Sequence, residues 1–183
     1  MRIVAGALRG RTLDGPTWDG LRPTSDSLRE TLFNVLGPTI SGVRMLDAFA
    51  GTGAVGIEAV SRGAARATFI ERDPRAIRLI EHNIAKLDLK KVSAIIRGDF
   101  MTSLAVAAAE AEFDLVFLDP PYDLPGLDGA IDLAAGMLAP GGRVVVEHGR
   151  KRELPAAVRG LPKYRTLVAG DSALSFYTAP EGA

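Results

Sequence analysis

The feature that most restricts the fold of this chain is a short apolar run followed at once by three closely spaced glycines. The apolar residues lie between positions 45 and 49, and apolar residues recur at helical spacing from 54 to 62. Glycine lets the backbone turn with almost no side-chain bulk, which leaves peptide N–H groups and a helix N-terminus facing whatever binds above the strand. The segment therefore predicts a strand, a tight turn and a helix that bind a ligand, with the turn built on Gly51, Gly53 and Gly56.

The glycine turn alone fits two classes of cofactor. Its spacing matches the dinucleotide fingerprint, and Glu71 lies where a ribose-binding acid is expected. A second motif separates the two classes. Residues 113–118 form another buried-strand pattern that ends in Asp119-Pro120-Pro121-Tyr122, which resembles the DPPY signature of methyltransferases that modify exocyclic amines of nucleobases. A nicotinamide dehydrogenase remains a distant alternative, since nothing after residue 147 resembles a substrate domain.

Strand and helix patterns alternate along the chain. Strands are expected at 45–49, 67–70, 92–96, 113–118 and 143–147, and helices at 54–62, 74–87, 102–111 and 127–138. A turn at 139–142 precedes the fifth strand, a short helix is expected near 154–159, and 164–168 with 174–178 form an antiparallel pair. The alternation predicts an α/β fold with a doubly wound, mostly parallel sheet and a C-terminal antiparallel hairpin.

The first forty residues differ from the rest in pattern. A small β-hairpin is expected within residues 1–13, followed by an irregular segment over 14–24. A capping box at Ser27 and Glu30 then begins a helix that Gly37 and Pro38 stop. We therefore divide the chain into an N-terminal extension, 1–40, and a cofactor-binding domain, 41–183.

Polar residues at four strand ends are expected to meet at one edge of the sheet. For S-adenosylmethionine, Asp47 would hold the amine directly or through water, Glu71 both ribose hydroxyls, and Asp99 the adenine amine. The expected cofactor-binding residues are Asp47, Phe49, Gly51, Gly53, Glu71, Asp99 and Asp119.

The Asp-Pro-Pro-Tyr segment suits an unusual nucleophile. An exocyclic amine is weakly nucleophilic because its lone pair is delocalised into the base. The Asp119 carboxylate and the Pro120 carbonyl can accept hydrogen bonds from the N–H groups of this amine, which frees its lone pair. The fixed φ of proline stiffens the turn. Tyr122 can stack on a base that has left its helix. The expected catalytic residues are Asp119, Pro120, Pro121 and Tyr122.

Composition excludes several other functions. The chain has no cysteine and only two separate histidines, so we expect no metal site. No apolar run reaches the length of a membrane span, and the start lacks a signal-peptide pattern, so we expect a cytoplasmic protein. Net charge is zero, but residues 1–13 and 143–165 are locally basic. Two such clusters favour a phosphate-bearing partner.

Several segments together resemble known families. Residues 47–56, Glu71, Asp99, 119–122 and 138–142 look like a Rossmann-like class I S-adenosylmethionine-dependent methyltransferase. Arg9-Gly10-Arg11, Leu21-Arg22-Pro23-Thr24 and Arg29-Glu30-Thr31-Leu32-Phe33-Asn34 are similar to the RsmD family of bacterial rRNA methyltransferases. The resemblance runs from Arg2 to Tyr177. It implies a seven-stranded sheet, methylation of N2 of guanine 966 in 16S rRNA, and an RNA-facing set of Arg9, Arg11, Arg22, Thr24 and Arg29.

Some alternatives stay open. Arg29 could instead pair with Asp26 or Glu30 on its own helix. Adenine-N6 and cytosine-N4 methyltransferases of DNA use the same tetrapeptide, although no separate DNA-reading domain is evident here. A non-enzymatic RNA-binding or assembly factor would not need the intact Asp119-Pro120 pair. We expect a monomer that acts on an assembled or partly assembled 30S subunit, where the shape of the particle supplies specificity.

Overall fold

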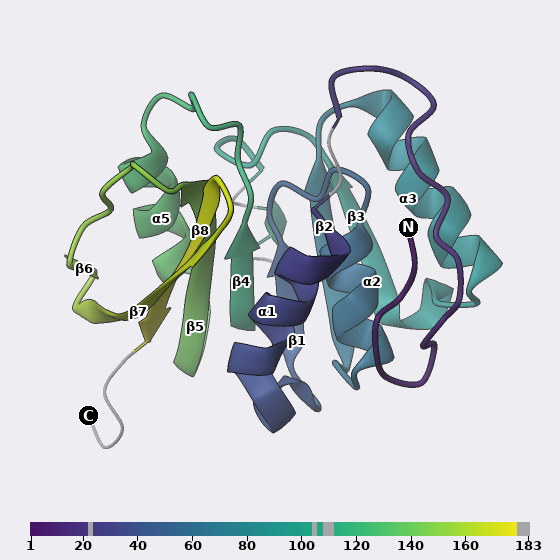
Figure 1. The fold of residues 1–183 in the computed structure, drawn as a ribbon, viewed down its shortest axis with the longest axis horizontal. Helices are drawn as coiled ribbons and strands as arrows, with labels where there is room; N and C mark the ends of the chain where they lie inside the picture. Colours follow the sequence, from purple (N-terminus) through teal and green to yellow (C-terminus); the bar gives the residue numbers. More distant parts are fainter. Residues whose placement is uncertain (22–23, 104–105, 108–111, 179–183) are drawn as a thin grey trace.

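The computed structural model describes residues 1–21, 24–103, 106–107 and 112–178 of the 183-residue chain. One twisted sheet runs through the molecule, in the order β3-β2-β1-β4-β5-β8-β7-β6 (Figure 1). The strands are β1 (Arg44–Asp47), β2 (Arg66–Glu71), β3 (Ser93–Arg97), β4 (Phe113–Leu118), β5 (Leu138–Gly149), β6 (Ala157–Val158), β7 (Leu161–Ala169) and β8 (Ser172–Thr178). The first five strands are parallel, and β8, β7 and β6 follow in antiparallel pairing. The predicted doubly wound sheet is confirmed, but it has eight strands rather than the expected seven, because the two-residue β6 pairs with β7 at its edge.

Helices cover both faces of the sheet. They are α1 (Asp26–Leu36), α2 (Ala54–Ser61), α3 (Pro74–Lys86) and α5 (Leu127–Ala135), with short 3₁₀ turns at Gly37–Ile40 and Lys90–Val92. Residues of α1 and α2 pack with alternate residues of β4 and β5, such as Phe117 and Val145, on one face. Residues of α5 pack with Val116 and Val144 on the other face. The predicted apolar stripe of α3 is confirmed, since Ile77, Ile80 and Ile84 are buried. The predicted helix over 102–111 falls largely outside the described residues.

Three local predictions were wrong. The N-cap of α1 is Ser25, whose hydroxyl accepts a hydrogen bond from the Leu28 N–H at 3.1 Å, and Ser27 already lies in the first turn. Residues 154–159 form no helix, because Arg159 and Gly160 both have positive φ and make a two-residue turn between β6 and β7. Residues 139–142 belong to β5, where the pairing register with β4 shifts and Gly141 takes a left-handed φ of 76°.

The N-terminal segment is hydrogen-bonded to the helices of the sheet domain. It folds back on itself as the predicted hairpin would, but with a single antiparallel bridge between Arg2 and Thr12. The buried Glu58 carboxylate of α2 accepts hydrogen bonds from the Val4 and Ala5 N–H groups at 2.8 and 2.9 Å. Residues 1–13 therefore lie on α2, with Ile3 and Leu13 in the same apolar cluster as Ile57 and Ile80.

Among the described residues, no helix combines the length and the apolar character needed to cross a membrane.

Candidate active site

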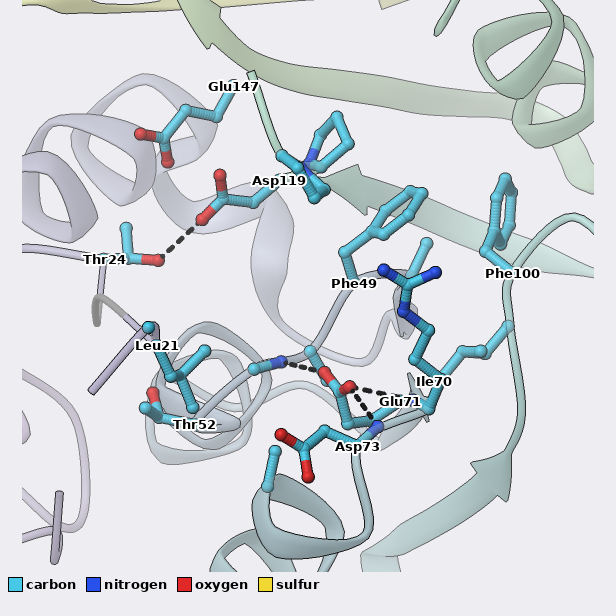
Figure 2. A pocket seen from close by; sticks show the side chains of 18 of the residues that line it. Leu21, Thr24, Phe49, Thr52, Ile70, Glu71, Asp73, Phe100, Asp119 and Glu147 are labelled. Atoms are coloured by element: carbon cyan, nitrogen blue, oxygen red, sulfur yellow. Dashed lines mark hydrogen bonds between the residues drawn. The ribbon is translucent and has the colours of Figure 1, made fainter. Parts of the chain in front are cut away.

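A cavity of about 710 Å³ opens at the carboxyl ends of the parallel strands. The segments after β1, β2, β3 and β4 all reach its wall, as the sequence predicts for Gly51, Glu71, Asp99 and Asp119 (Figure 2). The N-terminal segment forms a further wall through residues 18–21, 24–25 and 28. The family resemblance implies such a place for Thr24, at the border of the site. The cavity therefore lies between the sheet edge and the N-terminal segment.

The glycine turn depends on a left-handed backbone at one glycine and on close packing at another. Gly53 has a left-handed φ of 74° and is the N-cap of α2. Gly56 lies against the buried Phe69 ring of β2, where an added Cβ would come within 2.3 Å of Cε1. The turn is thus held close to the sheet, and its peptide groups border the cavity.

Glu71 fixes the turn through three backbone N–H groups. Its Oε2 accepts a hydrogen bond from Gly51 N at 2.8 Å, and its Oε1 accepts from Arg72 N and Asp73 N, both at 2.8 Å. An ionised carboxylate offers about four acceptor positions, so one remains for a ligand hydroxyl. Glu71 is therefore a fixed anion on the cavity wall, suited to a ribose.

An apolar patch lies next to Glu71 on the cavity wall. The rings of Phe49 and Phe100 contact each other, with centroids 5.4 Å apart at an interplanar angle of 52°, and Ile70 lines the same wall. Asp99 lines the wall beside this patch, and its carboxylate accepts hydrogen bonds from Met101 N at 2.9 Å and Arg72 Nη1 at 3.2 Å. An apolar patch with a carboxylate beside it suits an aromatic base bearing an amine, such as adenine.

Asp47 lies beneath the turn rather than on the cavity wall. Its side chain is 1% exposed, and its Oδ2 accepts a hydrogen bond from Gly56 N at 3.1 Å. Burial, aided by the charges of Asp119 and Glu71, raises the pKa of Asp47 to about 7. The expected direct contact between Asp47 and a cofactor amine is therefore not supported, because this carboxyl group is occupied with the helix N-terminus.

The Asp-Pro-Pro-Tyr segment follows β4 directly into the cavity. The Thr24 hydroxyl donates a hydrogen bond to Asp119 Oδ2 at 3.1 Å. Burial raises the pKa of Asp119 to about 6, and the Thr24 hydrogen bond opposes that rise. Tyr122 is 55% exposed at the cavity mouth, with its hydroxyl hydrogen-bonded to Ser172. The segment thus presents a buried carboxylate inside and an aromatic ring at the entrance.

Glu147 is a cavity residue that sequence reasoning missed. Asp119 follows Leu118 and Glu147 follows Val146, which are register partners in β4 and β5, so the two acids are neighbours on adjacent parallel strands. Burial, and then the charge of Asp119, raises the pKa of Glu147 to about 8. The rule used for the other strand ends, an acid directly after an apolar run, would have found it.

The five residues expected to face RNA are not gathered in one place. Thr24 lies in the cavity wall, whereas Arg9 and Arg11 are exposed and outside that wall. Arg22 lies outside the described residues.

Arg29 is wholly buried. Its guanidinium donates to the Arg2 carbonyl and to Asp26 at 2.7 Å, and to the Thr24 carbonyl at 3.2 Å. The alternative pairing with Asp26 is confirmed, and the expected RNA contact of Arg29 is corrected to a role inside the protein.

No group of three or more histidine, cysteine, aspartate or glutamate side chains that could hold a metal ion occurs in the described part of the chain.

Comparisons with known proteins match nearly the whole chain. The family model described as conserved hypothetical protein 95 matches residues 1–178. Ribosomal RNA small subunit methyltransferase D of Escherichia coli (strain K12) is 38% identical over 179 residues, which are 97% of this chain and 89% of that protein. The YlbH protein of Bacillus subtilis (strain 168) is 38% identical over 180 residues, which are 97% and 98% of the two chains. The solved structure of the yhhF protein from Escherichia coli has a TM-score of 0.84 at 38% identity and covers 98% of this chain and 97% of that one.

Proposed function

This chain belongs to the RsmD family of rRNA methyltransferases, and we propose that it transfers a methyl group from S-adenosylmethionine to the N2 amine of a guanine in 16S rRNA, at position 966. The observation that carries the proposal is a partly buried, ionisable Asp119 carboxylate in the same cavity as Glu71 and the Phe49–Phe100 patch. A carboxylate there can accept an amine N–H while the methyl donor lies alongside.

The residues present fit the family's cofactor. Glu71 would accept hydrogen bonds from the ribose hydroxyls and Asp99 from the adenine amine, and the adenine ring would pack on the apolar patch of Phe49 and Phe100. Gly51 and Gly53 let the backbone come close to the methionine part. When bound, S-adenosylmethionine supplies a methyl group already activated on a sulfonium.

The protein's part in the chemistry is to orient the amine and keep its lone pair available. The Asp119 carboxylate and the Pro120 carbonyl would each accept a hydrogen bond from one N–H group of the amine. These two hydrogen bonds turn the lone pair out of conjugation with the base. Thr24 holds Asp119 Oδ2 in place, and Pro120 and Pro121 restrict the backbone at the turn. Tyr122, half-exposed at the mouth, is placed to stack on the base.

The substrate is a structured particle under this proposal. Net charge is zero, so attraction to bulk RNA is weak, and specificity would come from shape. Residues 1–40 would be the RNA-facing extension, with Arg9 and Arg11 exposed on its surface, and residues 41–183 the methyltransferase domain. The protein would act as a monomer on an assembled or partly assembled 30S subunit.

Tritiated methyl transfer to small subunits from cells that lack the endogenous modification tests the proposal. Nucleoside digestion and chromatography should place the label in N2-methylguanosine, and mapping should place it at guanine 966. Label in N6-methyladenine or N4-methylcytosine from a parallel DNA sample, with none in rRNA, would keep the chemistry and overturn the substrate. Equal transfer to protein-free rRNA would overturn the requirement for an assembled particle.

A further inference from the structure

Glu147 and Asp119 are two acidic side chains placed together in a buried site. They follow register-paired residues of β5 and β4, and their carboxyl groups lie next to each other in the cavity wall (Figure 2). Glu147 is only 6% exposed. Asp119 is partly buried. Two adjacent carboxylates that have lost much of their hydration repel each other, so ionising both costs free energy.

One carboxylate oxygen of Glu147 lacks a hydrogen bond within the described part of the chain. Its Oε2 is buried and has no hydrogen-bond partner among the described residues. A single proton on Glu147 changes this, because the resulting O–H can donate to the neighbouring Asp119 carboxylate. That proton removes one charge and satisfies a buried polar atom at the same time.

We propose that Glu147 is a positioning residue that carries a proton and donates a hydrogen bond to Asp119, which keeps Asp119 ionised as the acceptor of the substrate amine N–H. This inference rests on the proposed methyl transfer. In that reaction the amine nitrogen forms a bond to the methyl carbon, the carbon–sulfur pair stays on sulfur, and one N–H proton passes to Asp119. A protonated Asp119 could not take that proton, so the pair's proton must be on Glu147.

The surroundings of the pair agree with this assignment. Burial raises the pKa of both carboxyl groups, to about 6 for Asp119 and to about 8 for Glu147, and the Asp119 charge adds to the rise at Glu147. The other groups near the pair are Thr24 on Asp119 Oδ2, Ser172 on Glu147, the Tyr122 hydroxyl on Ser172, Arg152 on the Tyr122 carbonyl, and Asp47 beneath Asp119. The one cation among these groups, Arg152, reaches a backbone carbonyl.

The pH dependence of methyl transfer is the test. Because Asp119 must be ionised, the rate should rise as pH increases through about 6. Because Glu147 must be protonated, the rate should fall as pH increases through about 8. Single-turnover rates should be measured across this range for the wild type, Glu147→Gln and Glu147→Ala. Glu153→Gln, an exposed change outside the cavity, is the matched control.

The two Glu147 variants should behave differently. Glutamine keeps a neutral donor but cannot ionise, so Glu147→Gln should retain at least a third of the wild-type rate at pH 7, and its alkaline decline should disappear or move up by a pH unit or more. Alanine removes the donor, and Glu147→Ala should lose at least tenfold at pH 7. The inference is overturned if Glu147→Gln keeps the wild-type alkaline decline, or if alanine is tolerated with less than a twofold loss.

A second readout does not depend on turnover. Infrared difference spectra of wild type against Glu147→Gln should show a protonated-carboxyl band at pH 7 that is lost as pH rises through about 8. Absence of the band at pH 7 contradicts the inference whatever the substrate is. A protein that shows the band but methylates no rRNA would contradict the proposed function and leave the shared proton in place.

Discussion

The hydroxyl of Thr24 donates a hydrogen bond to the carboxylate of Asp119 at 3.1 Å, across 95 residues of sequence. The carbonyl of the same threonine accepts a hydrogen bond from the buried Arg29 guanidinium at 3.2 Å, and Arg29 also binds the Arg2 carbonyl. A buried cation of the N-terminal segment thus fixes the residue that holds the proposed catalytic carboxylate. The N-terminal segment is therefore part of the candidate active site as well as a candidate RNA surface.

Replacing Thr24 by valine should shift the acid side of the pH profile. The variant keeps the side-chain shape and loses the hydroxyl that lowers the pKa of Asp119. The pKa of Asp119 should rise by about one pH unit, which corresponds to about 1.4 kcal/mol. The acid limb of the methyl-transfer rate should move to higher pH by the same amount, and the rate should fall about twofold at pH 7 and severalfold at pH 6, where less of Asp119 stays ionised.

Thr31→Val is the matched control for this change, because the Thr31 hydroxyl binds only the Ser27 carbonyl on an exposed helix face. It should leave the pH profile where it is. If Thr24→Val shows the wild-type profile, the hydrogen bond to Asp119 does not set its ionisation.

Replacing Glu71 by alanine should weaken cofactor binding. The change removes a proposed ribose acceptor and also frees the N–H groups of Gly51, Arg72 and Asp73. Loss of a charged hydrogen bond typically costs about 1.5–3 kcal/mol, so the Kd for S-adenosylmethionine in isothermal titration should rise at least tenfold. Glu81→Ala, which breaks a surface pair with Arg97, should leave the Kd unchanged. Equal affinity of wild type and Glu71→Ala would remove Glu71 from the cofactor site.

Local patterns of apolar and polar residues predicted most of the strands of the sheet. Residues 113–118 match β4 at both ends, and the apolar stripe of α3 has the predicted members, because side-chain periodicity is fixed by the local backbone. The same patterns could not predict that residues 139–142 extend β5. Glycines at such positions fit a turn and a bulge equally well, and only pairing with β4 decides between them.

Replacing Gly56 by alanine should destabilise the fold. Its Cβ would come within 2.3 Å of the buried Phe69 ring, and overpacking of this kind costs about 1–3 kcal/mol. For a chain of this size, each kcal/mol lowers the melting temperature by about 2–4 °C. Gly129→Ala in α5, where an added Cβ meets nothing within 4 Å, should be neutral or stabilising. Equal melting temperatures for the two variants would contradict close packing at Gly56.

Replacing Asp47 by asparagine should stabilise the protein in a pH-dependent way. Burial raises the pKa of Asp47 to about 7 from its usual value near 3.8. Between these values the folded protein holds a proton that the unfolded chain releases, so the wild type loses stability as pH rises towards 7. Asparagine carries no charge and can still accept from Gly56 N. The variant's gain in melting temperature should be small at pH 4 and a few degrees at pH 8, and a gain that is the same at both values would contradict burial of an ionising group.

The candidate site was predictable where an acidic residue directly follows a predicted parallel strand. Glu71, Asp99 and Asp119 reach the cavity because the carboxyl ends of parallel strands share one edge of the sheet. The environment of a charged side chain is set by distant residues. The burial of Arg29 against Arg2 therefore could not be predicted from local pattern.

The hydrogen bond between Thr24 and Asp119 also has a consequence for the order in which the site forms during synthesis of the chain. Thr24 is made early, whereas Asp119 and Glu147 leave the ribosome about 95 and 123 residues later. At synthesis rates of about 5–20 residues per second, the early segment waits roughly 6 to 25 seconds for Glu147. Until Asp119 is made, the Thr24 hydroxyl has no carboxylate to bind. A newly made chain therefore completes its candidate site only after Glu147 has been made.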